Sequence, residues 1–176
     1  MRFLAFLAAW VLAFAAHAGA DPRPSPILSP AELSALIASA SPAVTVIDIR
    51  PPAEYRQGHI PGALSAPYGS WRGPAHSPGT LPPLEALTAQ VRKLGLTPAR
   101  HAVVVSSGAD VTDFGAAARV YWTLKYLGLE RLSVLNGGMQ AWQQAQQPLS
   151  TEAAPVPAPS DYEPKLNTAI IATQSD

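Results

Sequence analysis

The stretch VVVSSGADVTDFGAAARVYW, from Val103 to Trp122, has the pattern of a buried strand, a short loop and a helix. Its first residues belong to an apolar run, HAVVVS, of the kind found in buried parallel strands. After the loop, apolar residues recur at helical spacing, at Ala117, Val120, Tyr121, Leu124 and Leu127. This succession of elements favours an α/β fold.

The loop between that strand and that helix has a chemical consequence. Its backbone N–H groups and the positive end of the helix point at one place, which suits an anion or a nucleophile. We therefore predict an anion-binding loop, and its candidate residues are Ser107, Gly108, Ala109, Asp110, Val111 and Thr112.

The flanking sequence continues the alternation of strands and helices. Strand-like runs at 43–49 and 131–135 alternate with helical patterns that begin near Ser29, Leu84 and Gly138. This order predicts a mostly parallel central sheet flanked by helices. Ligands bind at the carboxyl ends of strands in such sheets. Three informative stretches follow predicted strands, DIRPPAEY, SSGADVTD and NGGMQAW, so we expect one site there.

Composition narrows the class of protein. The 176 residues are 48% hydrophobic and 14% charged, which is enough for one domain with a sizeable core. The formal net charge is zero and no basic stripe occurs, so a nucleic-acid partner is not expected. The chain has no cysteine and no pair of ligand-type residues at metal spacing. We expect neither a metal nor a cofactor.

The first 18 residues have the form of a signal peptide. Arg2 precedes an apolar run from Phe3 to Ala16, and Ala16-His17-Ala18 is a small-x-small cleavage site. Because 14 apolar residues are short for a membrane span, we expect a cleaved leader and a periplasmic or secreted protein. The alternative is an uncleaved N-terminal anchor.

The remaining boundaries follow from composition. Residues 19–28 form a Pro-rich N-terminal segment, and residues 29–148 form the predicted domain. From 149 to 176 the chain is rich in Pro, Ala and Ser, which is typical of a linker or tail that leads to a further domain.

Two motifs resemble signatures of the rhodanese family of sulfurtransferases. VIDIRPPAEYRQGHIPGALSAPY resembles the first, through Asp48, Arg50, Glu54, Tyr55, Gly58, His59, Ile60, Pro61, Gly62 and Ala63. LSVLNGGMQAW resembles the second, through Leu135, Gly137, Gly138, Ala141 and Trp142. The resemblance implies a rhodanese-like three-layer domain with a mostly parallel central sheet.

The resemblance also implies a chemistry that this chain cannot perform in the usual way. The family moves sulfane sulfur from donors such as thiosulfate through a persulfide on a loop cysteine, and Ser107 stands at that position here. The chain is therefore similar to the cysteine-less first domain of tandem rhodaneses. We expect the inactive or regulatory half of a tandem thiosulfate sulfurtransferase, whose partner is a second rhodanese domain or another protein. The alternative is a stand-alone module that binds a protein or a small anion such as thiosulfate.

The charged residues of the first motif leave two interpretations open. Asp48, Arg50 and Glu54 could orient a substrate anion, but a structural ion-pair cluster is favoured because two acids largely neutralise the arginine. His59 could shuttle protons, but a structural hydrogen-bonding role is favoured in a turn so rich in Gly and Pro. His101 is expected at the surface, like His76.

A third, enzymatic interpretation rests on the two serines of the loop. Ser106 or Ser107 could act as a hydrolase nucleophile with His59 as base and Asp48 or Asp110 as its orienting acid. VSSGA is not the Gly-x-Ser-x-Gly pattern of such enzymes, which argues against it.

Local charge argues against sulfur chemistry even with a cysteine in place. No Lys or Arg lies between Ser107 and Asp113, whereas Asp110 and Asp113 add two negative charges. Arg119, the nearest cation in sequence, lies almost two turns into the predicted helix. We expect the loop to keep its backbone donors but to repel a second anion.

Overall fold

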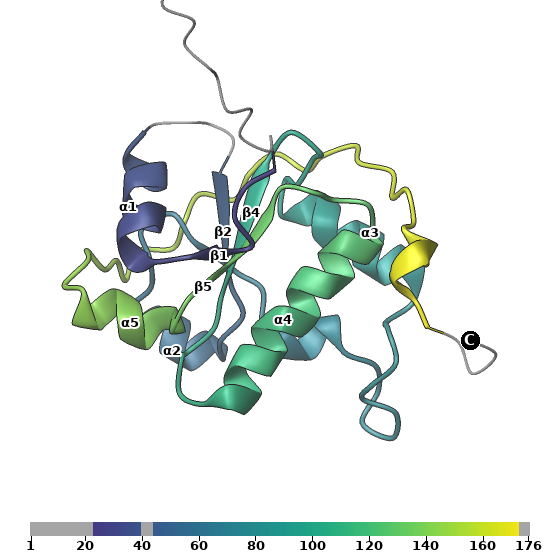
Figure 1. Cartoon of the computed structure of the whole chain (residues 1–176), viewed down its shortest axis with the longest axis horizontal. Helices are drawn as coiled ribbons and strands as arrows, with labels where there is room; N and C mark the ends of the chain where they lie inside the picture. The colour runs from purple at the N-terminus through teal and green to yellow at the C-terminus, as the bar shows by residue number, and fades with distance from the viewer. Residues whose placement is uncertain (1–22, 40–43, 173–176) are drawn as a thin grey trace, which may run out of the picture.

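The computed structural model describes residues 23–39 and 44–172, so the predicted leader lies outside the described residues. Within these residues, five parallel strands form one sheet in the order β1-β5-β4-β2-β3 (Figure 1). Their bounds are β1 Ile27–Leu28, β2 Val44–Asp48, β3 Leu64–Ser65, β4 His101–Val105 and β5 Leu132–Leu135. The predicted α/β class is confirmed, and the sheet is wholly parallel.

Helices cover both faces of the sheet (Figure 1). One face carries α1 Pro30–Ala38, α2 Pro52–Gln57 and α5 Gly138–Gln144, and the other carries α3 Leu84–Lys93 and α4 Val111–Tyr126. The alternation of side chains along a strand divides the core accordingly. In β4, Val103 and Val105 pack with α1 and α5, whereas Val104 packs with α3 and α4. Every residue of β4 is buried, as befits the central strand.

The sequence patterns missed the short elements. β1 lies in the Pro-rich N-terminal segment and pairs with β5, with Ile27 opposite Val134 and Leu28 opposite Leu135. Strands of two residues are too short to show a hydrophobic period, so only pairing with a neighbour defines them. The 3₁₀ turns Tyr68–Trp71 and Thr168–Ile170 are likewise too short to show a hydrophobic period, and they were missed too.

The segment predicted as a linker lies along the domain wherever the structure describes it (Figure 1). Ser150 and His59 exchange two backbone hydrogen bonds of 2.9 Å, and the Tyr162 hydroxyl donates to the Leu127 carbonyl at 2.7 Å. The Asn167 N–H donates to the Tyr126 carbonyl at 2.8 Å. These hydrogen bonds, most of them between backbone groups, hold the segment against the domain, and its amino-acid composition does not predict them.

His101 is buried, so its expected surface position is wrong. It begins β4, and its Nε2 lies 2.8 Å from the Ser133 hydroxyl oxygen. Burial first, and then the charge of Arg131, lower the pKa of His101 to about 4. The neutral ring is therefore part of the core at the amino end of the sheet.

No described helix is both long enough and apolar enough to span a bilayer.

Candidate functional site

The loop between β4 and α4 is held against the turn that precedes α5. Gly108 has a φ of +81°, and a Cβ on it would lie 1.9 Å from the Gly137 carbonyl oxygen. A Cβ on Gly138, whose φ is +52°, would lie 2.4 Å from the Ser106 carbonyl oxygen. Only glycine permits so close an approach of two backbones. Gly108 in the loop and Gly138 in NGGMQAW therefore allow this close contact.

Helix α5 directs its first N–H groups at the same loop. The Met139 N–H donates to the Ser106 carbonyl and the Gln140 N–H donates to the Ser107 carbonyl, both at 2.9 Å. These donors would otherwise be free at a helix start. Here the Ser106 and Ser107 carbonyls occupy them, so these two N–H groups are not available to a ligand.

A carboxylate of the chain itself binds the donors of the loop. Asp113 accepts from the Ser107 N–H at 3.3 Å through Oδ1 and from the Gly108 N–H at 2.5 Å through Oδ2. This is the geometry by which a loop at a helix start holds an anion. The loop has the backbone N–H donors that the sequence predicts. Asp113 was expected only to repel an anion, but in the structure it accepts hydrogen bonds from the Ser107 and Gly108 N–H groups.

The carboxylate form of Asp113 is stabilised where it lies. Partial burial opposes ionisation, but hydrogen bonds from Gly108, Ser106 and Ser107 outweigh it and lower the pKa of Asp113. At neutral pH the loop therefore carries its own anion, and a second anion would have to displace it.

Asp110 occupies a second set of donors as the N-cap of α4. Its Oδ1 accepts from the Thr112 N–H at 2.8 Å and from the Asp113 N–H at 2.9 Å. Such a cap satisfies N–H groups that a free helix start would offer to a ligand. Arg119 does not compensate for the two acids, because its guanidinium donates to the Gly79 carbonyl and lies over the Trp122 ring.

A shallow apolar cavity of about 360 Å³ lies beside the loop. Val111 and Phe114 line it, and they stay 87% and 45% exposed. Helical periodicity did not single out either residue. An exposed apolar pair on the rim of a cavity is a feature of interaction surfaces.

The cluster of the first motif lies at the carboxyl end of β2. Arg50 is 7% exposed, and its guanidinium donates to both Asp48 oxygens at 2.6–3.1 Å and to the Gly58 carbonyl at 2.8 Å. Glu54 is a weaker partner at 4.0 Å. The donors of Arg50 are directed at these neighbours, so this geometry matches a structural ion pair.

His59 is fully buried and stacks on Tyr55 with ring centroids 3.7 Å apart. Its Nδ1 lies 2.7 Å from the Tyr55 carbonyl oxygen and its Nε2 lies 3.0 Å from that of Glu152. Both ring nitrogens thus contact backbone carbonyls. This arrangement leaves no nitrogen to take a proton from Ser107, so a serine hydrolase finds no support in the geometry.

The remaining motif residues shape the backbone. Gly62 adopts a φ of +77° in the turn before β3. The Tyr55 hydroxyl donates to the Ala63 carbonyl at 2.6 Å. Trp142 is 1% exposed, and its indole N–H donates to the Pro148 carbonyl at 2.9 Å.

The comparisons with known proteins agree with this architecture. The family model of the rhodanese-like domain matches residues 29–145, and the chain belongs to that family. It is 36% identical over 135 residues to a thiosulfate sulfurtransferase of Azotobacter vinelandii, covering 76% of this chain and 46% of the relative. A thiosulfate sulfurtransferase of Bos taurus is 34% identical over 121 residues, covering 68% and 40%.

A solved 3-mercaptopyruvate sulfotransferase of Escherichia coli has the same fold. It superposes with a TM-score of 0.69 at 25% identity, covering 86% of this chain and 60% of that chain. The protein is thus a rhodanese-like sulfurtransferase-family domain without cysteine. It spans less than half the length of the curated relatives that it matches.

Proposed function

We propose that this chain is the inactive half of a two-domain sulfurtransferase, and that it covers one side of the active site of a cysteine-bearing rhodanese domain. The observation that carries the proposal is the Asp113 carboxylate on the Ser107 and Gly108 N–H groups. A loop that holds its own anion does not bind thiosulfate, and a serine oxygen cannot carry a persulfide.

The apolar rim of the loop supports a partner at this face. Val111 and Phe114 lie beside the site, and fully burying an exposed side chain of this kind contributes at most about 1.5–3 kcal/mol, less for the half-buried Phe114. The relatives are about twice as long as the matched region, so they carry sequence for a second domain. A second domain against α4 would bury both residues.

The test is association with a cysteine-bearing rhodanese domain of the source organism, measured by isothermal titration calorimetry. We expect saturable 1:1 binding that Val111→Ser and Phe114→Ser each weaken about tenfold. Val156→Ser is the matched control because Val156 is 78% exposed on the tail, and it should change the affinity less than about twofold. Wild-type affinity in both rim variants would overturn the proposed surface.

Activity provides an independent arm. The chain alone should show no thiosulfate-to-cyanide sulfur transfer above background, whereas its complex should be at least as active as the cysteine-bearing domain alone. Turnover by the purified chain would contradict the inactive role. Failure to bind any cysteine-bearing domain would favour the stand-alone module.

Export belongs to the same proposal and rests on the leader-like N-terminus. N-terminal sequencing of protein recovered from the source organism should begin at Gly19 or within a few residues of it. Met1 on abundant, membrane-extracted protein would contradict it.

A further inference from the structure

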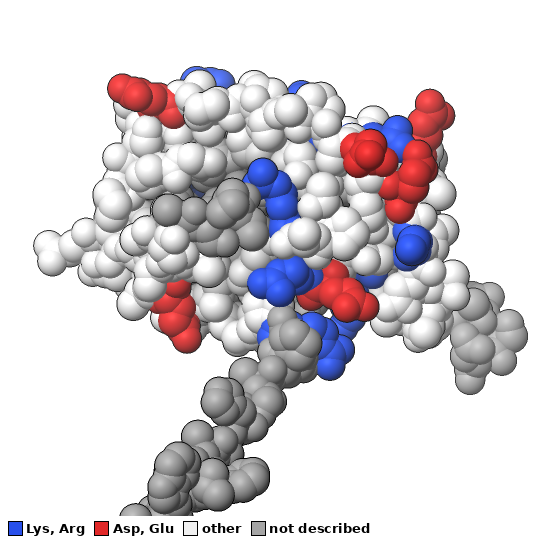
Figure 2. All heavy atoms as spheres, turned by 90° about the horizontal axis from the view of Figure 1, so that it is seen from above, with Lys and Arg blue, Asp and Glu red and all other residues white. Residues whose placement is uncertain are grey.

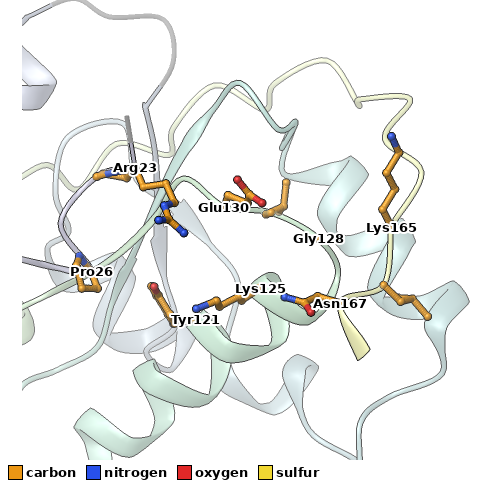
Figure 3. Close-up of a pocket in the computed structure, with 11 residues that line it drawn as sticks. Arg23, Pro26, Tyr121, Lys125, Gly128, Glu130, Lys165 and Asn167 are labelled. Carbon is orange, nitrogen blue, oxygen red and sulfur yellow. The ribbon is translucent and has the colours of Figure 1, made fainter. Parts of the chain in front are cut away.

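Two adjoining cavities lie at the opposite end of the sheet from the loop. They have volumes of about 600 and 430 Å³ and share Arg23, Gly128, Glu130 and Lys165 in their walls. The N-terminal segment, the end of α4, the turn before β5 and the tail meet there (Figure 3). Segments distant in sequence thus build one hollow.

The walls of these cavities concentrate positive charge. Arg23, Lys125, Arg131 and Lys165 line one or both, against the single acid Glu130 among the described lining residues. They are four of the 12 Lys and Arg residues in a chain of zero net charge. Figure 2 shows Lys and Arg side chains gathered around acidic groups on this face. The local excess favours an anionic ligand.

The polar groups of the larger cavity converge from different sides. In Figure 3 the Arg23 guanidinium, the Tyr121 hydroxyl and the Lys125 ammonium point toward one another across the hollow. Neither Lys125 nor Lys165 forms an ion pair with another described residue. An oxyanion in the hollow would be attracted to the Arg23 and Lys125 side chains from two sides.

We propose that these cavities bind a small oxyanion of the phosphate class, with room for two linked groups. A tetrahedral oxyanion presents oxygens in more directions than a planar carboxylate does, and Arg23, Tyr121 and Lys125 line the cavity from different sides. The adjoining cavity, with Arg131 and Lys165, accepts the second group. The larger cavity is also lined by Pro24, Pro26 and Leu129. Apolar walls lower the local dielectric constant and so strengthen the attraction between the cations and a bound anion. The site is independent of the proposed partner at the loop.

The experiment is an amide NMR titration of the whole chain with sodium pyrophosphate at constant ionic strength. We expect saturating shifts at residues 121–130 and 165–167, with none at 107–113. The double variant Arg23→Gln/Lys125→Gln should weaken binding at least about tenfold, since charged hydrogen bonds are lost. The matched control Arg72→Gln/Lys93→Gln removes two exposed cations elsewhere and should change the affinity less than about twofold.

Three outcomes would overturn the proposed site. The first is amide shifts that grow linearly with pyrophosphate and do not saturate. The others are an equal loss of affinity in the two double variants, and amide shifts confined to residues 107–113. Sodium malonate tests the chemical class, and binding as tight as that of pyrophosphate would overturn the preference for phosphate. Thermal unfolding of each double variant without ligand checks that it is folded. We expect both variants to fold, because all four substituted side chains are exposed at the surface.

Discussion

The two ends of the sheet treat anions in opposite ways. At the carboxyl end, where the family's chemistry is expected, the Asp113 carboxylate occupies the Ser107 and Gly108 donors and Asp110 caps the helix. At the amino end, cations face one another across open cavities. A loop can keep the backbone of an anion site and still be closed to anions, because one side chain supplies the charge from within.

The largest effect is expected from a substitution of Gly138, at the contact between the loop and the turn before α5. Gly138→Val places a branched side chain at a φ of +52° against the Ser106 carbonyl, and we expect a loss of about 3–5 kcal/mol in unfolding free energy or failure to fold. Urea denaturation measures it. Gly115→Ala is the control, because its site in α4 is open, and it should stabilise by about 0.5–1 kcal/mol.

The amino end has its own pH dependence through His101. Its pKa is lowered to about 4 in the folded state, so the neutral ring stabilises the fold above the unfolded pKa of about 6.5. That stability is lost as the pH falls from about 6.5 to 4, by about 2–3 kcal/mol. Urea unfolding of wild type and of His101→Gln at several pH values measures this. The unfolding free energy should fall between about pH 6.5 and 4 in wild type and not in the variant. An equal fall in both proteins would contradict the role of His101.

A cysteine in the loop sharpens the comparison chemically. Ser107→Cys should fold, show no substantial sulfur transfer, and have a thiol pKa at or above about 8.5, because Asp113 holds the donors that would stabilise a thiolate. Adding Asp113→Asn should lower that pKa by about one unit. The measurement is the pH dependence of iodoacetamide alkylation. A thiol pKa near 7 in the single variant would show that Asp113 does not close the site.

The smallest expected effect is that of Asp113→Asn alone. Its folded pKa is lowered, so the carboxylate stabilises the fold above its unfolded pKa of about 3.9, and that stability is lost as the pH falls through the folded pKa. We expect the variant to lose about 1 kcal/mol at pH 7, after allowance for partial exposure, and less in acid. Equal stability at pH 7 would mean that the two hydrogen bonds contribute nothing net.

Individual residues show where reasoning from sequence succeeded. The long buried strand at 101–105 and the helix that ends near Leu127 were evident, because their hydrophobic periods are long enough to be distinctive. The sequence did not reveal β1, β3 or the packing of residues 149–172 against the domain, because backbone hydrogen bonds define them. His101 was misplaced because burial of a polar ring depends on the Ser133 hydroxyl from the neighbouring strand.

The sequence by itself determined the α/β class, the two rhodanese-like motifs, the position of the loop and the lack of a sulfur-carrying residue. All of these depend on local periodicity, spacing or residue identity. Only the tertiary structure decided that Asp113 turns back onto the loop and that Arg23 and Lys125, about a hundred residues apart, face the same cavity. The physical reason is that hydrogen bonds and charge pairing depend on distance in space, which the folded sheet sets and the order of residues does not.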